Sequence, residues 1–272
     1  MSASQFQSGG GGRRGRRGSS GGGAGGSRGP RDPYSSSGAG QGDSGGNAPE
    51  SSNDVAIRTL KRALAESEER GDKAGILTSH TSLAVALLEA GRAPEALEHC
   101  QRCLELAEEL KDSVARASAY MRLGQAQSDL RAYAEAIAAY ERALEVFQEL
   151  GDSPGTAAAY SKLGETYYRE GEYAEAISRL QQALELYQQV NDLVAIALTH
   201  STLGAARYHQ GRYEGALEEH KAALNIWQRL NNAGGMATSY NYLAAIYNAQ
   251  GRYDQAMINY GLASAALVRS KR

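Results

Sequence analysis

The residue types most able to do chemistry stand together in one short stretch. His99, Cys100 and Cys103 form a His-Cys-x-x-Cys motif, whose spacing is typical of zinc ligands and of redox-active cysteine pairs. A structural zinc site needs four ligands, and the chain has only 2 cysteines. Forty residues further along, the same two positions hold Tyr140 and Ala143, which we interpret as packing residues. We therefore interpret them as packing residues and predict no metal.

A second candidate is the stretch Gly21-x-Gly23-x-x-Gly26, which matches the dinucleotide-binding fingerprint as a string. That fingerprint needs a strand before it and a helix after it. The sequence offers neither, so we interpret the stretch as low complexity. The P-loop, the His-Glu-x-x-His motif and the serine-nucleophile elbow do not occur in the sequence. We predict a protein that is not an enzyme and that uses no cofactor.

The composition changes sharply near residue 53. Residues 1–53 hold 17 of the 32 glycines and almost no large aliphatic residues. Such a segment buries too little apolar surface to offset the entropy lost on ordering, so we predict a disordered tail. Its basic cluster can be interpreted as part of a flexible leader, as an RNA-associating segment or as a nuclear import signal. The cluster consists of Arg13, Arg14, Arg16 and Arg17.

The net charge and the distribution of apolar residues limit the classes of partner and the cellular location that the sequence allows. The formal net charge is −2, which argues against a body whose main partner is nucleic acid. No apolar run reaches the length of a signal peptide or a membrane span, so we predict no membrane partner. With 2 cysteines and no Asn-x-Ser/Thr sequon, a reducing compartment fits best. We predict a cytoplasmic protein, with the nucleus as an alternative.

From Asp54 onward the sequence repeats with a period of 40 residues. The leucine of a Leu-Gly or Leu-Ala pair recurs at Leu83, Leu123, Leu163, Leu203 and Leu243. An alanine follows each leucine by 13 residues, at Ala96, Ala136, Ala176, Ala216 and Ala256. Small residues at fixed positions allow two helices to approach closely. We therefore predict pairs of antiparallel helices that stack into an all-α solenoid.

Polar residues and glycines punctuate the same period. Candidate N-caps precede the first helix of each pair, at Asp72, Asp112, Asp152, Asp192 and Asn232. A glycine suited to the left-handed conformation ends the first helix at Gly91, Gly171, Gly211 and Gly251. Arg131 occupies this position in the second pair, so we expect a turn there that differs or is strained.

A lone helix is expected to precede the pairs. Ala56, Ile57, Leu60 and Ala63 match the second-helix positions of the repeat, and we interpret this half-repeat as an N-terminal cap. The half-repeat and five pairs give about eleven helices. The predicted boundaries are 1–53 for the tail, 54–72 for the half-repeat, and 73–110, 111–150, 151–190, 191–230 and 231–272 for the five repeats.

The third repeat carries a Leu-Gly pair followed by aromatic and small residues, at Leu163, Gly164, Tyr167, Tyr173, Ala176 and Ala183. This pattern resembles the tetratricopeptide repeat (TPR) over roughly residues 54–270, and the 40-residue period is similar to the leucine-glycine-asparagine (Pins-like) subgroup. The asparagine of that subgroup is absent, since its position reads Val85, Gln125, Glu165, Ala205 and Ala245. The resemblance implies a TPR superhelix whose first helices line the concave surface. It further implies a non-catalytic adaptor that binds a peptide of a protein partner, within a cytoskeletal, polarity or trafficking complex.

The candidate site consists of residues on first helices that do not occupy a repeated packing position. Most of the 16 tyrosines fall at packing positions, but Tyr168, Tyr208 and Tyr242 do not, and all three lie on first helices. Aromatic anchors and cationic side chains dominate binding hot spots. We predict a peptide groove centred on repeats two to four, although ordinary solvated helix faces are the alternative. The candidates are Arg122, Gln125, Asp129, Lys162, Glu165, Tyr168, Arg169, Tyr208, His209, Asn241, Tyr242 and Asn248.

Other partners were weighed on the same residues. The clamp that binds acidic chaperone peptides needs a Lys/Asn set over consecutive repeats, and Arg122 and Lys162 supply only fragments of it. In the last helix, Tyr260 and Ala263 stand where a following helix would pack. We expect this face to pair with itself or with a partner, unless the chain is a shortened form. The competing function class is an RNA-associated factor, in which the tail binds nucleic acid and the repeats recruit protein.

Overall fold

The computed structural model describes residues 51–269, and the predicted tail and its arginine cluster lie outside these residues. The described part is all helical and contains no strand. Its eleven helices, as predicted, are α1 (Ser52–Arg70), α2 (Lys73–Glu89), α3 (Ala93–Glu109), α4 (Ser113–Asp129), α5 (Tyr133–Leu150), α6 (Ser153–Glu170), α7 (Tyr173–Val190), α8 (Leu193–His209), α9 (Tyr213–Arg229), α10 (Ala233–Ala249) and α11 (Tyr253–Arg269).

The predicted N-caps begin every first helix. In each case the capping side chain accepts a hydrogen bond of 2.8–3.1 Å from the backbone N–H three residues later. This bond satisfies an amide that would otherwise lack a partner at the helix start. The second helices α3, α5, α7 and α9 begin without a side-chain cap. The strongest local start signals therefore mark the first helix of each repeat.

Left-handed residues close the turns of the array. Gly91, Gly171, Gly211 and Gly251 end the first helices at φ values between 70° and 97°, as predicted. Arg131 adopts the same conformation, at φ 62°, so the turn is retained in strained form. The turn between repeats is left-handed too, a feature that the sequence analysis did not identify. It falls at Gly71, Lys111, Gly151, Asn191 and Asn231.

The small residues of the repeat lie where the two helices of a pair touch. A Cβ atom on Gly124 would lie 2.8 Å from the Tyr140 ring. A Cβ on Gly204 would lie 2.6 Å from the ring of His220, which occupies the same position two repeats later. Contacts this short are incompatible with a side chain. The prediction that small residues permit close helix approach is therefore confirmed.

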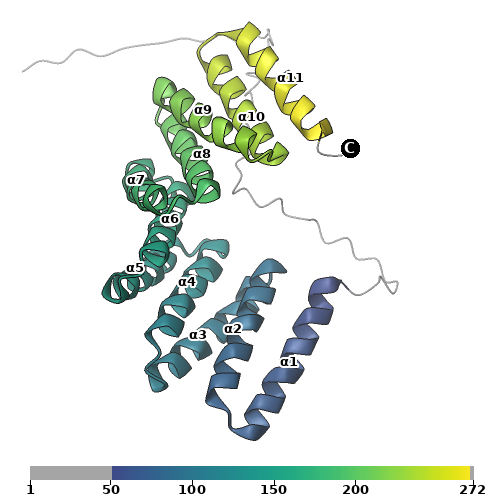
Figure 1. Cartoon of the computed structure of the whole chain (residues 1–272), viewed down its shortest axis with the longest axis vertical. Helices are drawn as coiled ribbons and strands as arrows, with labels where there is room; N and C mark the ends of the chain where they lie inside the picture. The colour runs from purple at the N-terminus through teal and green to yellow at the C-terminus, as the bar shows by residue number, and fades with distance from the viewer. Residues whose placement is uncertain (1–50, 270–272) are drawn as a thin grey trace, which may run out of the picture.

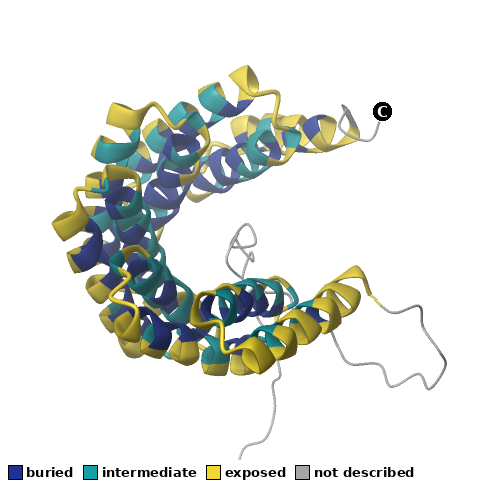
Figure 2. Cartoon of the chain, turned by 60° about the horizontal axis from the view of Figure 1, so that its bottom comes forward, coloured by how far each residue is buried: buried dark blue, intermediate teal, exposed yellow. Residues whose placement is uncertain are grey.

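The helices form a curved array that is open on one side (Figures 1 and 2). First helices of successive repeats contact one another, as do α2 and α4, α4 and α6, α6 and α8, and α8 and α10. Within residues 51–269, no such contact joins successive second helices. Elements that meet across every repeat lie at the smaller radius of a curved array. The first helices therefore form its concave side and the second helices its outer side.

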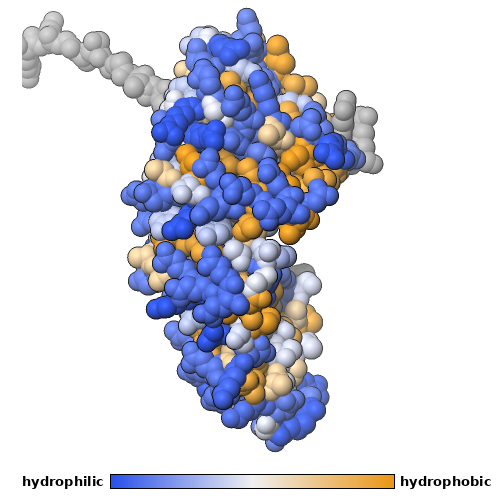
Figure 3. All heavy atoms as spheres, turned by 60° about the vertical axis from the view of Figure 1, so that its left-hand side comes forward, coloured by the Kyte–Doolittle hydropathy of each residue, from blue (hydrophilic) through white to orange (hydrophobic). Residues whose placement is uncertain are grey.

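The first helix contacts the rest of the array through one apolar face. Helix α1 packs on α2 through Ile57, which is buried, and through Leu60 and Leu64, which are partly buried. The left-hand side of the molecule in Figure 1, where α5 to α7 lie, is largely hydrophilic with separate apolar patches (Figure 3). No helix among the described residues is long and apolar enough to cross a membrane.

Candidate functional site

Charges are sorted between the two sides of the array. The first helices α2, α4, α6, α8 and α10 carry 6 Lys and Arg residues against 4 Asp and Glu residues. The second helices α3, α5, α7, α9 and α11 carry 6 basic and 15 acidic residues. The acidic excess of the array therefore lies on the outer helices. The concave helices are near-neutral to slightly basic.

Helices α4 and α6 enclose a small polar cleft of about 50 Å³. Arg169 Nη1 donates to Asp129 Oδ1 and to Ser128 Oγ, both at 3.2 Å, and thereby joins two neighbouring first helices. Lys162 Nζ donates to Glu165 Oε2 at 2.7 Å along α6. The lining of this polar cleft comprises Gln125, Ser128, Asp129, Tyr140, Lys162, Glu165, Thr166 and Arg169. Five predicted site residues thus meet in one place.

The floor of the polar cleft comes from a second helix. Tyr140 of α5 packs beneath Gly124, where the missing side chain lets its ring pass between α4 and α5. Burial raises the pKa of Tyr140, and the carboxylates of Glu165 and Asp129 raise it further. We had interpreted Tyr140 as a packing residue, and its burial confirms this. It also lines the polar cleft, because the glycine in front of it opens the way to the concave side.

Arg122, another of the predicted site residues, is not among the residues that line the polar cleft. Its Nε is buried and has no hydrogen-bond partner among the described residues. Its positive charge acts on the thiols of Cys100 and Cys103 in α3. Lys162, by contrast, pairs with Glu165 along α6.

An aromatic cluster joins α6, α7 and α8. The His209 ring stacks on the Tyr173 ring with a centroid distance of 5.2 Å, and it meets the Tyr208 ring at 5.4 Å. The Tyr168 ring lies 5.8 Å from both Tyr173 and His209. Burial raises the pKa of Tyr208, which is half-buried. His209 is the exposed member of the cluster.

Two of the predicted aromatic anchors are not available at the surface. Tyr168 is 5% exposed and Tyr242 is 1% exposed, so neither ring can serve as an exposed anchor of the predicted peptide groove. The next repeat covers Tyr168 through His209. Tyr242 stacks on His220 with a centroid distance of 4.4 Å and packs beside the small residues Ala205 and Ala206. Both rings fill crevices between neighbouring repeats because smaller residues there leave room for them.

The remaining predicted residues lie on the last concave helix. Asn241 and Asn248 are both half-buried on α10. Neither asparagine lines the polar cleft. The predicted set therefore divides into the polar cleft, the aromatic cluster and scattered positions, and does not form one continuous groove.

A larger apolar pocket lies between α8 and α10, and the sequence analysis missed it. Its volume is about 380 Å³, and its lining is Leu198, Ser201, Thr202, Trp227, Asn232, Gly235 and Thr238. Trp227 reaches it from α9 because Gly235 has no side chain, since a Cβ there would lie 2.4 Å from the indole. No charged residue lines this apolar pocket. Such a cavity suits a large apolar side chain.

The polar atoms of the lining are largely used within the protein. Ser201 and Thr202 donate to the backbone carbonyls of Ala197 and Leu198, four residues earlier. The Asn232 side chain accepts from the Gly235 N–H as the N-cap of α10. The lining is therefore more apolar than its residue names suggest. The available signal in the sequence was Trp227, the single tryptophan of the chain, opposite a glycine at the start of α10.

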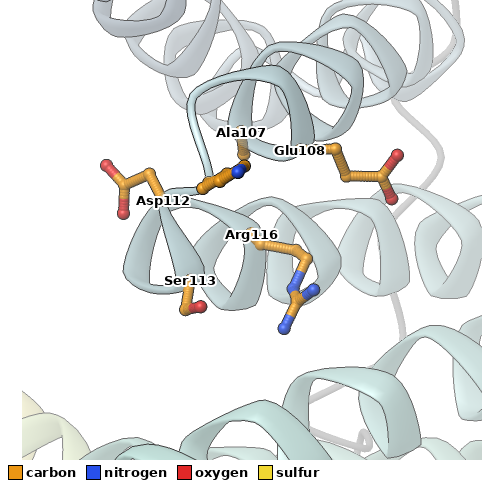
Figure 4. A pocket seen from close by; sticks show the side chains of 6 residues that line it. Ala107, Glu108, Asp112, Ser113 and Arg116 are labelled. Carbon is orange, nitrogen blue, oxygen red and sulfur yellow. The ribbon is translucent and has the colours of Figure 1, made fainter.

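The His-Cys-x-x-Cys motif contributes to the packing of the helices. Cys100 and Cys103 are free and buried, and burial raises the pKa of the Cys100 thiol to about 12. Their interpretation as packing residues is confirmed. A further hollow of about 250 Å³ lies at the turn between α3 and α4. The side chains of Glu108, Asp112 and Arg116 point in different directions there and do not converge on a ligand position (Figure 4).

The paired helices and their concave surface define a helical-repeat protein. The family model described as "Tetratricopeptide repeat" matches residues 75–149, 115–189 and 195–267. The chain belongs to this family. The Pins-like subgroup stays a prediction. The comparison with curated proteins gives no match.

Solved structures share the fold at low sequence identity. BtubC (BKLC) from P. vanneervenii has a TM-score of 0.72 and 20% identity, covering 82% of this chain and 93% of that chain. The TPR-like repeats of a putative kinesin light chain from Podosopora anserina have a TM-score of 0.61 and 21% identity, covering 72% and 97%. A Rap protein complexed with competence and sporulation factor has a TM-score of 0.61 and 15% identity, covering 81% and 67%. These likenesses establish the fold alone.

Proposed function

We propose that the protein is a non-catalytic adaptor whose concave surface binds a segment of a protein partner. The fold is typical of protein-interaction scaffolds. The observation that carries the proposal is the apolar pocket between α8 and α10, which opens among first helices and has room for a large side chain.

The same surface supplies a second kind of contact two repeats away. In the polar cleft, Lys162 is partly exposed and pairs only along its own helix, with Glu165. An incoming carboxylate can compete for the ammonium group, because surface ion pairs of this type are weak. The slightly basic concave helices contrast with the acidic outer helices. The partner segment that fits carries a large apolar residue and, further along, acidic residues.

Random-peptide display on the full chain tests this proposal without a known partner. We expect the selected peptides to combine a large apolar residue with acidic residues. Two variants then locate the contact, Leu198→Glu at the rim of the apolar pocket and Lys162→Glu in the polar cleft. We expect each to weaken binding by about tenfold or more, as for hot-spot residues. The matched control is Glu145→Lys on the outer helix α5, which should leave the affinity unchanged.

Two results would contradict the proposal. One is a display that enriches no peptide at all. The other is an affinity that drops for Glu145→Lys and holds for Leu198→Glu and Lys162→Glu. Circular dichroism of each variant shows whether the helices are intact, so that a loss of binding is not a loss of folding.

The alternative of an RNA-associated factor rests on Arg13, Arg14, Arg16 and Arg17, which lie outside the described residues. The array adds no basic surface to this cluster, since residues 51–269 hold 21 Lys and Arg against 28 Asp and Glu. We therefore favour a protein partner. Membership in a cytoskeletal, polarity or trafficking complex, in the cytoplasm or the nucleus, remains part of the proposal.

A further inference from the structure

The last helix exposes residues whose counterparts in other repeats are buried. Met257 of α11 is 69% exposed, whereas Ile177 at the same position of α7 is 9% exposed. Tyr260 is 46% exposed, against 1% for Tyr140 of α5. Inside the array, the first helix of the next repeat covers this face, as α6 covers α5 and α8 covers α7. No described residue covers it on α11.

The exposed side chains form a stripe along α11. Tyr253, Met257 and Tyr260 follow one another at spacings of four and three residues, which places them on one side of a helix. Leu267 lies two turns further along on the same side and is also exposed. Within α11 the only charged residues are Asp254 and Arg269, at its two ends. An apolar stripe without central charges is poorly suited to permanent contact with water.

The opposite end of the array is an unsuitable occupant. The exposed surface of α1 carries Arg62, Glu66 and Arg70, whose side chains are all more than half exposed. Packing α11 of one copy on α1 of another would remove these charges from water without new partners on the apolar stripe. A second α11 stripe brings no such charges. A two-fold contact is also the commonest symmetry of homo-oligomers.

We propose that the α11 stripe pairs with the same stripe of a second copy of this chain, in a two-fold dimer. At about 150–250 Å² for a fully exposed tyrosine and less for the smaller side chains, the four residues offer roughly 500 Å² per copy. The pair then buries about 1,000 Å², which lies at the lower limit for a specific interface. The dimer is therefore weak, with a dissociation constant in the micromolar range.

The proposal is tested by sedimentation of the full chain over a concentration range of roughly 1–200 μM. We expect a reversible monomer–dimer equilibrium. The variant Met257→Glu places a charge in the stripe of both copies and should raise the dissociation constant at least tenfold. Ile258→Glu is the matched control, because Ile258 is also exposed on α11 but points away from the stripe. It should change the dissociation constant less than threefold.

Three outcomes would overturn the proposal. A chain that stays monomeric throughout has an α11 face that is free, or that another segment of the chain covers. A dimer that persists unchanged in Met257→Glu forms through another surface. An equal effect of Met257→Glu and Ile258→Glu means that the stripe is not the contact. Both residues are exposed, so both variants should keep wild-type helicity, and circular dichroism confirms this before sedimentation.

Discussion

The polar cleft and the apolar pocket occupy the same concave side on the same helical skeleton, yet their chemistry is opposite. The repeat places Lys162 and Glu165 on α6, where α8 has Thr202 and Ala205 at the same positions. This position of Lys162 and Thr202 is the only repeat position that lines both sites, and the rest of the uncharged lining of the apolar pocket comes from other positions of the repeat. The residues that decorate the skeleton therefore decide both where on the concave side a ligand can lie and which ligand it is.

The largest expected effect is that of a substitution at Gly235. The apolar pocket requires a glycine at this position but not at the neighbouring Gly234. Gly235→Val puts a side chain into the Trp227 ring and should cost about 3 kcal/mol of stability, as overpacked cores do. It should also close the apolar pocket and abolish peptide binding. The measurement is denaturant unfolding together with peptide affinity.

The matched control is the neighbouring Gly234→Ala. A Cβ at this position meets only Asn232 Oδ1, at 3.5 Å. Alanine in a helix should then stabilise by about 0.5–1 kcal/mol. If both glycine variants destabilise equally, the apolar pocket does not depend on close packing of Trp227.

A second effect concerns the buried imidazole of α9. His220 is fully buried, and neither ring nitrogen has a hydrogen-bond partner among the described residues. The preceding repeat has Leu180 at this position. His220→Leu should therefore stabilise the chain by about 1–3 kcal/mol, because an unsatisfied polar group leaves the core.

For the same variant we also predict a change in how the stability of the fold depends on pH. Burial lowers the pKa of His220 to about 3, so the unfolded chain binds a proton that the folded chain rejects. Stability should fall as the pH drops from about 6.5 towards 3, and His220→Leu should reduce this fall. Burial also lowers the pKa of His80 and His99, so only the difference between variant and wild type reports on His220. Parallel curves for the two proteins would contradict this explanation.

The smallest expected effect is a difference between the polar cleft and the apolar pocket in how peptide affinity depends on salt concentration. Contacts at Lys162 are electrostatic and partly exposed, so raising the salt concentration should weaken peptide binding several-fold. Lys162→Gln should have lower affinity at low salt and a flatter salt dependence. Leu198→Ala should have lower affinity with the salt dependence of the wild type. An identical salt dependence in all three proteins would mean that the polar cleft makes no contact with the peptide.

Much of the fold could be predicted because it depends on local and repeated signals. N-caps such as Asp152, left-handed glycines such as Gly171 and the small residue Gly124 act on neighbours within one repeat. A fixed period then places those neighbours in every repeat. The strained turn at Arg131 was foreseen for the same reason, since its position in the period is known.

The site was less predictable because it depends on contacts between repeats. Whether a ring on a first helix faces solvent or fills a crevice is decided by the residues of the adjoining helices. Tyr242 is buried because His220 offers a face to stack on, and Tyr168 because His209 covers it. The apolar pocket was missed because Trp227 is placed by a glycine of the following repeat. Alignment of the repeats identifies these positions but does not show how deeply each side chain is buried.

Hydrogen–deuterium exchange of the full chain, with and without a selected peptide at saturation, tests the concave surface most directly. Binding there should slow exchange in the first helices α6, α8 and α10, which supply most of the polar cleft and the apolar pocket. The outer faces of α5 and α7 should exchange as in the free chain. Protection confined to second helices, or no protection at saturating peptide, would contradict the account.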